Sequence, residues 1–200
     1  LGKVVAEADP TAGKEELASL MVGRAVDLTI DKAPAQLTDN TLVIENLTIA
    51  DELGHRAVQD LSVTIRGGEI LAIAGVQGNG QTELAEALLG LRERASGSIS
   101  LNGTELLGLN ARQILDNGVG YVPEDRTVDG LVGGFSVAEN LMLDRSDGEP
   151  FVKLGTLQTD ALNEFATEKL KSYDIRSQSI HEHVSKLSGG NQQKVVLARE

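Results

Sequence analysis

The chain has 200 residues, enough to bury a sizeable core, and its 40% hydrophobic and 24% charged residues are typical of a folded protein. Its 30 acidic residues outnumber 18 basic ones, and the net charge of -12 argues against nucleic acid or anionic lipid as a primary partner. Cysteine is absent, which excludes disulfides and thiolate metal sites, and no apolar run is long enough to span a bilayer.

The first 41 residues predict two connected pieces and no core of their own. A short strand over 2–7 precedes a helix over 15–22, and Gly23 is a stop signal for that helix. Residues 1–26 hold too few apolar side chains to fold alone, so they are interpreted as the end of an upstream unit. Residues 27–41 are polar, include a proline and show no period, which indicates a linker.

Residues 42–123 alternate between strand and helix patterns, which predicts an α/β fold. Two runs, 69–74 and 118–123, have the apolar character of strands buried on both faces of a sheet. The remaining elements are predicted as strands over 42–49 and 58–65, a strand ending in a turn over 97–103, a helix after residue 82 and a short helix over 110–117.

From residue 124 onward the pattern is mostly helical. Ser136-Val137-Ala138-Glu139 has the sequence of a capping box, which predicts that a helix begins at Ser136. A second helix is predicted over 159–173, and Ser188 is placed to cap a third.

A glycine-rich loop, Gly75-Val76-Gln77-Gly78-Asn79-Gly80-Gln81-Thr82, lies between the apolar run at 69–74 and the next helix. Glycines let several backbone N–H groups turn into one cavity, and the start of a helix adds positive potential there. This is the context of a phosphate-binding loop, in which Thr82 would ligate Mg²⁺. The alternative is a strand-to-helix turn that binds nothing, and the loop alone does not decide between them.

The phosphate-loop pattern requires a lysine where this chain has Gln81. Glutamine donates hydrogen bonds to phosphate oxygens but brings no charge. The loss of one charge-assisted hydrogen bond costs about 1.5–3 kcal/mol, or about ten- to a hundredfold in affinity. We therefore expect this loop to bind nucleotide weakly or to turn it over slowly.

A second glycine motif, Leu187-Ser188-Gly189-Gly190-Asn191-Gln192-Gln193-Lys194, lies near the end of the chain. Its serine and glycines are compatible with a second anion site at a helix start, or with an ordinary capped turn. The full string resembles the signature motif of ABC-type ATPases, in the form typical of importers for monosaccharides and nucleosides. The residues that the resemblance assigns to the signature are Ser188, Gly189, Gly190 and Gln192.

Other segments carry the same resemblance. Residues 75–82 are similar to the family's Walker A loop, and Gly67-Gly68-Glu69-Ile70 is similar to the turn before its strand. Residues 119–126 resemble the strand leading into the Q-loop, with Glu124 where many members have glutamine. Residues 1–26 resemble the end of a preceding cassette, which implies the second cassette of a tandem protein.

The resemblance implies a P-loop ABC cassette over 42–200. It would combine an antiparallel β subdomain with a RecA-like core in residues 42–122, and a helical subdomain in residues 123–200. The cassette is expected to be incomplete, because the family's Walker B aspartate, catalytic glutamate and switch histidine would follow residue 200. No catalytic residue is therefore assigned, and the 200-residue chain alone is expected not to hydrolyse ATP.

The resemblance implies that ATP and Mg²⁺ are the ligands and that Thr82 and Glu124 would bind the metal. Two cassettes of this family face each other head to tail, so this signature would close over the nucleotide of the first cassette. The carboxylate of Glu124 would repel bare phosphate, and residues 51–57 contain no aromatic side chain to stack on adenine. The residues implied for the chain's own nucleotide site are Gly75, Gln77, Gly78, Asn79, Gly80, Gln81, Thr82 and Glu124.

The implied partners are the first cassette of the same polypeptide and membrane permease subunits, the latter facing residues 124–140. The parent protein would lie on the cytoplasmic face of the plasma membrane as a peripheral protein, coupling ATP hydrolysis to uptake of a sugar or nucleoside. No nucleic acid partner and no membrane insertion are expected. Two alternatives remain: a structural or regulatory cassette that dimerises without nucleotide, and a soluble ABC ATPase acting on DNA or ribosomes, which the acidic charge and the signature disfavour.

Three further features receive ordinary structural interpretations. Residues 141–144 resemble a Walker B strand, but they follow a capping box and are predicted to be helical. His181 and His183 are expected to be exposed to solvent and not to form a metal pair, and His55 is expected in a turn.

Overall fold

The computed structural model describes residues 4, 6–23 and 33–200. Near the N-terminus, helix α1 (Lys14–Val22) ends at Gly23, whose left-handed backbone lets its N–H donate to the Ser19 carbonyl at 2.8 Å. This confirms the predicted helix and its stop signal. Residues 4, 6 and 7 lie in no strand, while 2, 3 and 5 of the predicted strand lie outside the described residues. Residues 33–40 of the predicted linker have no regular structure, and 27–32 are also outside the described residues.

The predicted antiparallel sheet is confirmed, with four strands in the order β2-β1-β3-β4. Strand β1 lies between β2 and β3, so that Ile44 faces both Val63 and Ile99. The strands are β1 (Thr41–Ala50), β2 (Arg56–Arg66), β3 (Ala95–Leu101) and β4 (Thr104–Glu105). Residues 51–55, which join β1 to β2, include the predicted turn at His55.

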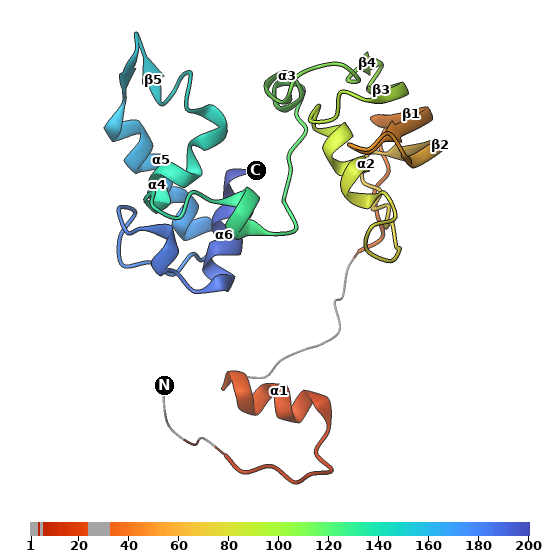
Figure 1. Cartoon of the computed structure of the whole chain (residues 1–200). Coiled ribbons are helices and arrows are strands. Elements are labelled where there is room, and N and C mark those ends of the chain that lie inside the picture. The colour runs from red at the N-terminus through yellow and green to blue at the C-terminus, as the bar shows by residue number, and fades with distance from the viewer. Residues whose placement is uncertain (1–3, 5, 24–32) are drawn as a thin grey trace.

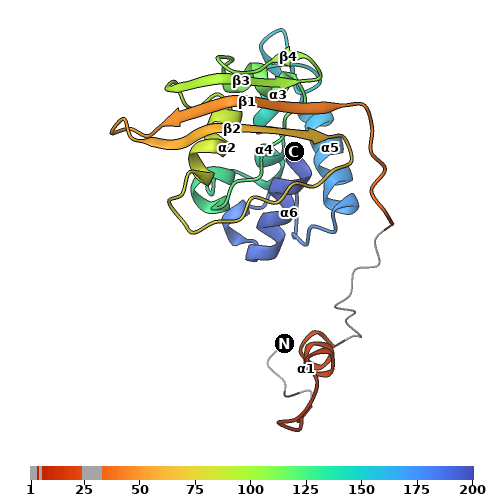
Figure 2. The ribbon, with the colours of Figure 1, turned by 90° about the vertical axis from the view of Figure 1, so that its right-hand side faces the viewer.

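Helix α2 (Gln81–Leu88) covers one face of this sheet, and Figure 2 shows it behind the strands. Leu84 and Ala87 of α2 are buried against the strands, together with Ile44, Leu47, Ile49, Ile99 and Leu106. The short helix α3 (Ala111–Asp116) begins at Asn110, which forms a capping box with Gln113. This small core fixes the start of α2, and with it the end of the glycine-rich loop.

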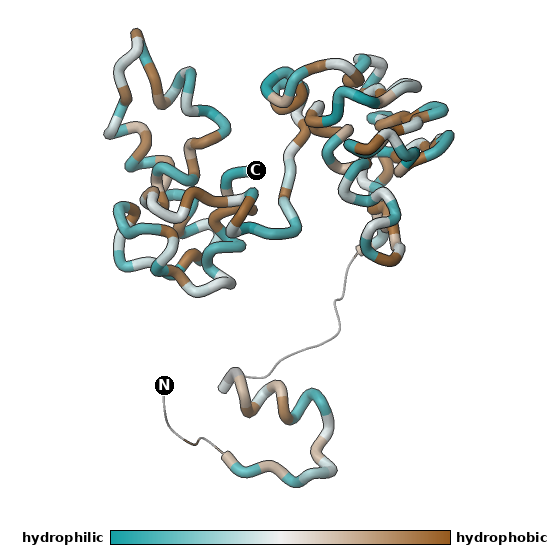
Figure 3. The backbone as a smooth tube through the Cα atoms, viewed as in Figure 1, coloured by the Kyte–Doolittle hydropathy of each residue, from teal (hydrophilic) through white to brown (hydrophobic). Residues whose placement is uncertain are grey.

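The predicted strands over 69–74 and 118–123 are wrong for this structure, because neither segment is assigned to a strand. Ile70 is 78% exposed and Ile73 57% exposed. Figure 3 shows hydrophobic stretches along the backbone of both units. A strand buried on both faces needs hydrogen-bonded neighbours at its edges. The described residues place no paired strand beside either segment. The run at 69–74 stays exposed, whereas in 118–123 Pro123 is buried and Val119 packs against the core beside the sheet.

The second unit is mostly helical and lies beside the sheet-bearing unit, joined to it by residues 117–125 (Figure 1). Its core contains Phe151 and the apolar faces of the three α-helices, including Val137, Leu162 and Val195. The elements are the π-helix η1 (Arg126–Gly130), α4 (Val137–Leu141), η2 (Leu143–Arg145), β5 (Val152–Lys153), β6 (Thr156–Leu157), α5 (Thr159–Ser172), η3 (Val184–Lys186) and α6 (Gly189–Arg199).

Most sequence predictions for this unit are confirmed. Ser136 and Glu139 form the predicted capping box at the start of α4. Residues 141–144 run from the end of α4 through a turn at Met142 into η2 and lie in no strand, as the capping box indicates. The β5–β6 hairpin was not predicted, because each strand is only two residues long. Among the described residues, no helix is both long and apolar enough to cross a membrane.

Candidate functional site

The glycine-rich loop leads directly into α2 and presents its backbone to solvent. Gly78 and Gly80 have φ of 86° and 95°, which lets the chain double back before the helix begins. Gly80 is packed so closely on β2 that an added Cβ would lie 2.4 Å from the Ala57 carbonyl oxygen. Within the described part of the chain, no backbone N–H of residues 76–80 donates a hydrogen bond of normal geometry. The N–H groups of the exposed residues 76–79 and those of the first turn of α2 are open to an anion, whereas Gly80 is buried.

Gln81 occupies the interior of the loop. Its Nε2 donates a long hydrogen bond of 3.4 Å to the Val76 carbonyl. A Cβ on Gly75 would lie 2.2 Å from that same nitrogen, so the glycine leaves the space that the amide fills. The amide therefore spans the loop, which supplies a hydrogen-bond donor there but no positive charge. Gln77, Asn79 and Thr82 are exposed.

A cavity of about 620 Å³ brings Gln81, Thr82 and Glu124 together, although Glu124 lies on the segment joining the two units. Glu86 and Asp129 also line it, and neither lysine nor arginine is among its lining residues. Burial raises the pKa of Tyr121 in the same wall, and the nearby carboxylates, Asp129 foremost, raise it further. The cavity is thus acidic, and a bound polyphosphate needs a compensating cation.

Mg²⁺ fits the donors that the cavity offers. It prefers oxygen ligands and is commonly held by one or two protein oxygens together with the substrate's phosphates. The exposed hydroxyl of Thr82 and the exposed carboxylate of Glu124 are such oxygens. Among the described residues, no group of three or more His, Asp or Glu side chains is arranged to hold a metal by itself. His181 and His183 are both exposed, as expected.

The second glycine motif begins α6 at the surface of the helical unit. Ser188, Gly189 and Gly190 are all exposed, and Ser188 occupies the N-cap position. Its hydroxyl caps no backbone N–H, contrary to the prediction, and instead accepts a 3.0 Å hydrogen bond from Asn191 Nδ2. The first N–H groups of α6 therefore keep their capacity to bind an anion.

Gln192, also assigned to the signature, is directed into the helical unit. Its Oε1 accepts from Arg126 Nε at 3.2 Å, and its Nε2 donates to the Val184 carbonyl at 3.1 Å. Both ends of its amide are thus engaged within the protein, unlike the exposed serine and glycines before it.

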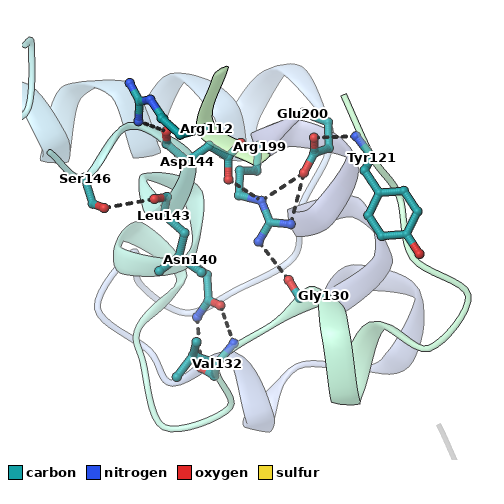
Figure 4. Close-up of polar contacts among 10 residues, drawn as sticks. All are labelled: Arg112, Tyr121, Gly130, Val132, Asn140, Leu143, Asp144, Ser146, Arg199 and Glu200. Carbon is teal, nitrogen blue, oxygen red and sulfur yellow. Dashed lines mark hydrogen bonds and ion pairs between the residues drawn. The ribbon is translucent and has the colours of Figure 1, made fainter. Parts of the chain in front are cut away.

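Sequence reasoning missed a polar network that fastens the helical unit (Figure 4). Arg199 of α6 pairs with Asp144 at 2.9 Å and donates to the Gly130 carbonyl at 2.8 Å. Burial raises the pKa of Asp144, and the positive charge of Arg199 opposes that rise. Asn140 is fully buried and bonds both backbone groups of Val132. The signal for Asn140 is a polar residue beside the apolar positions Val137 and Leu141 of a short helix, whereas nothing local marks Arg199.

Arg112 extends this network to the sheet-bearing unit. From α3 it donates to the Asp144 carbonyl at 2.9 Å and to the Asp147 carboxylate at 2.7 Å. The Tyr121 N–H donates to the Glu200 carboxylate at 2.8 Å. The two units are therefore linked by polar contacts as well as by the connecting segment.

Comparison with known proteins gives one family. A family model described as "ABC transporter" matches residues 58–200. The chain is 43% identical over 187 residues to the guanosine import ATP-binding protein NupO of Bacillus subtilis, covering 94% of this chain and 37% of that protein. It is 44% identical over 186 residues to the nucleoside import ATP-binding protein NupA of Lactococcus lactis, covering 93% and 37%.

Sugar-import proteins are also similar. The chain is 32% identical over 198 residues to the ribose import ATP-binding protein RbsA of Corynebacterium glutamicum, covering 99% of this chain and 36% of that protein. The chain therefore spans little more than a third of the length of these curated relatives.

Proposed function

This chain belongs to the ABC transporter family, and we propose that it forms part of the ATP-binding cassette of an importer for a nucleoside or simple sugar. The named functions of its relatives support this assignment. The observation that carries it is the open row of backbone N–H groups at the exposed residues 76–79, shortly before α2 and the cavity that is lined by Thr82 and Glu124. Because the two nucleoside-import relatives share more identity, a nucleoside is the first solute to test.

Within this proposal, the chain contributes to two nucleotide sites. Its own loop, with Gln81 in place of lysine, forms a weak ATP site. Its exposed Ser188–Gly190 segment closes over the nucleotide of a first cassette in the same polypeptide. The chain covers 36–37% of each of these relatives, which is compatible with a longer tandem protein. Permease subunits are the proposed membrane partners, and the ATP-binding protein is proposed to contact them from the cytoplasmic side of the membrane.

The proposed roles follow from charge. Mg²⁺, when bound, neutralises phosphate charge that the acidic cavity would otherwise repel. Thr82 and Glu124 hold the metal through their oxygens, the loop N–H groups hold the phosphates, and the Gln81 amide donates a neutral hydrogen bond. This arrangement binds metal-loaded nucleotide in preference to free nucleotide.

Calorimetric titration of the complete protein with ATP, with Mg²⁺ and with EDTA, tests the site. Gln81→Lys should tighten Mg-ATP binding about ten- to a hundredfold, because it restores one charge-assisted hydrogen bond. Gln81→Met, which has similar length but neither charge nor donor, is the matched control and should weaken binding. No gain with lysine would contradict a phosphate-binding role for the loop.

The same titration distinguishes the ATP-binding cassette from a second candidate function. A structural or regulatory cassette would dimerise without binding nucleotide at its own loop, and the charge of Glu124 and the missing lysine favour that alternative. If ATP gives no heat of binding in a protein whose first cassette's site is blocked by mutation, the structural or regulatory alternative is supported. Uptake of a labelled nucleoside by cells that carry the intact transport system tests the coupling to import. Uptake should be lost when the gene for this protein is deleted.

A further inference from the structure

Arg126 lies two residues after Glu124, but its side chain reaches away from the cavity toward α6. Its Nε donates to Gln192 Oε1 at 3.2 Å, across 66 positions of sequence. The preceding Asp125 accepts hydrogen bonds from the N–H groups of Thr127, at 2.7 Å, and Val128, at 3.4 Å. The start of η1 is thereby fixed, and with it the direction of the arginine side chain.

The Arg126 guanidinium also lies against the first residue of α6. A Cβ on Gly189 would be 2.6 Å from Arg126 Nη2, whereas no described atom lies within 4 Å of a Cβ placed on Gly190. Neither glycine has a positive φ, so the backbone conformation alone does not require glycine at these positions. Gly189 therefore leaves room for a guanidinium, while Gly190 faces open space.

The other end of η1 is fastened to the same helix. The Gly130 carbonyl accepts from Arg199 Nη1 at 2.8 Å, and a Cβ on Gly130 would lie 3.3 Å from Val196. The Arg199 side chain is only 9% exposed, so its hydrogen bonds are shielded from water. Helix η1 is thus held to α6 at both ends, by Arg126 near the start of α6 and by Gly130 at its end.

We propose that Arg126 is a positioning residue that holds the Ser188–Gly190 segment in a fixed relation to the chain's own nucleotide cavity. The inference rests on the proposed function and deepens it. Through this contact η1, whose Asp129 lines the cavity, is held against the Ser188–Gly190 segment. The guanidinium acts through Gly189 and Gln192 and contacts no nucleotide.

The contact is tested first without nucleotide. Because the chain has no cysteine, Ser188→Cys accepts a single nitroxide label, whose mobility is read from its electron paramagnetic resonance spectrum. Arg126→Ala should increase mobility at residue 188 and leave a label at the exposed Glu168→Cys unchanged. Arg126→Lys keeps the charge without the planar guanidinium, and should restore the spectrum only in part.

Two further variants keep this test decisive. Gln192→Met removes the acceptor for Arg126 and should produce the same increase if Arg126→Ala does not fold. Lys171→Ala removes a positive charge from an exposed position on α5 and should change neither spectrum. An unchanged spectrum at residue 188 in folded Arg126→Ala or Gln192→Met would overturn the proposal.

Activity is tested in the complete protein assembled with its permease. Arg126→Ala should lower kcat for ATP hydrolysis about tenfold and change KM for ATP by less than about threefold, because the loss falls on the closed state and not on nucleotide capture. Lys171→Ala should stay within about twofold of wild type, the usual scatter for an exposed position. If Arg126→Ala makes the label at residue 188 more mobile but leaves kcat unchanged, the proposed role of Arg126 in ATP hydrolysis is refuted.

The two failures are distinguishable. If the complete wild-type protein neither binds nor hydrolyses ATP, the proposed function fails, although the label result still reports the Arg126 contact. If wild type is active and the label at residue 188 is insensitive to Arg126, the proposed function stands and this inference fails.

Discussion

Replacement of Asn140 by alanine tests how the helical unit is held together. This side chain is fully buried (Figure 4). Its Oδ1 accepts from the Val132 N–H at 2.8 Å, and its Nδ2 donates to the carbonyls of Val132 at 3.1 Å, Phe135 at 3.4 Å and Ser136 at 2.9 Å. One amide therefore ties the loop before α4 to the helix.

The loss of stability in Asn140→Ala depends on which backbone groups lose their last hydrogen-bond partner. The Val132 carbonyl also accepts from the Phe135 N–H, the Phe135 carbonyl from the Val184 N–H, and the Ser136 carbonyl from the backbone N–H of Asn140 itself. Only the Val132 N–H is left without a partner. Val132 itself is 41% exposed, so its N–H does not carry the full penalty of a buried unsatisfied donor, and the lost hydrogen bonds together should cost about 1–3 kcal/mol in Asn140→Ala.

Urea unfolding at 25 °C, followed by circular dichroism, measures this loss. Asn117→Ala is the control, because Asn117 is exposed and its side chain donates one hydrogen bond, to the Gln113 carbonyl; its cost should be below about 1 kcal/mol. A loss in Asn140→Ala no larger than in the control would refute the accounting.

Asn140→Asp separates donor from acceptor at the same site. Aspartate keeps the acceptor for the Val132 N–H but turns a charged oxygen toward three carbonyls, so at pH 7 it should destabilise more than alanine does. Burial raises the pKa of such a carboxyl, which favours its protonated form in the folded state. The deficit relative to Asn140→Ala should therefore shrink as pH falls toward about 4 and grow as pH rises.

Four other substitutions have distinct expected outcomes. Gly80→Ala should cost about 2 kcal/mol or more, since it combines a positive φ with a clash against a β2 carbonyl, whereas Gly78→Ala carries only the backbone strain of about 1 kcal/mol; thermal melting compares them. Ser136→Ala removes the hydroxyl hydrogen bond that does most to hold the pKa of Glu139 below its ordinary value of 4.5, but keeps the bond from the backbone N–H of residue 136. The contribution of the hydroxyl bond is present above about pH 4.5 and lost as pH falls, so the difference in unfolding free energy from wild type should narrow in acid. Phe151→Ala, at a fully buried position, should cost about 3–5 kcal/mol in urea unfolding.

The sequence was sufficient wherever the decisive interactions are short in range. The capping box at Ser136, the stop at Gly23 and the start of α6 at residue 188 depend on groups within a few positions of each other. The alternating strands β1 and β2 follow from their pattern of apolar residues and lie next to each other in the chain. The motifs at 75–82 and 187–194 indicated the family, which the comparisons support.

Tertiary structure decided what depends on partners distant in sequence. The apolar run at 69–74 predicts a buried strand, but strand pairing requires a neighbour, and the described residues place none beside it. The meeting of Glu124 with Thr82 in one cavity, and of Arg126 with Gly189 and Gln192, likewise appears only in three dimensions. The local sequence pattern indicates the secondary structure that a segment prefers and which of its side chains tend to be buried. Which side chain of a distant element lies beside it depends on the packing of the whole unit.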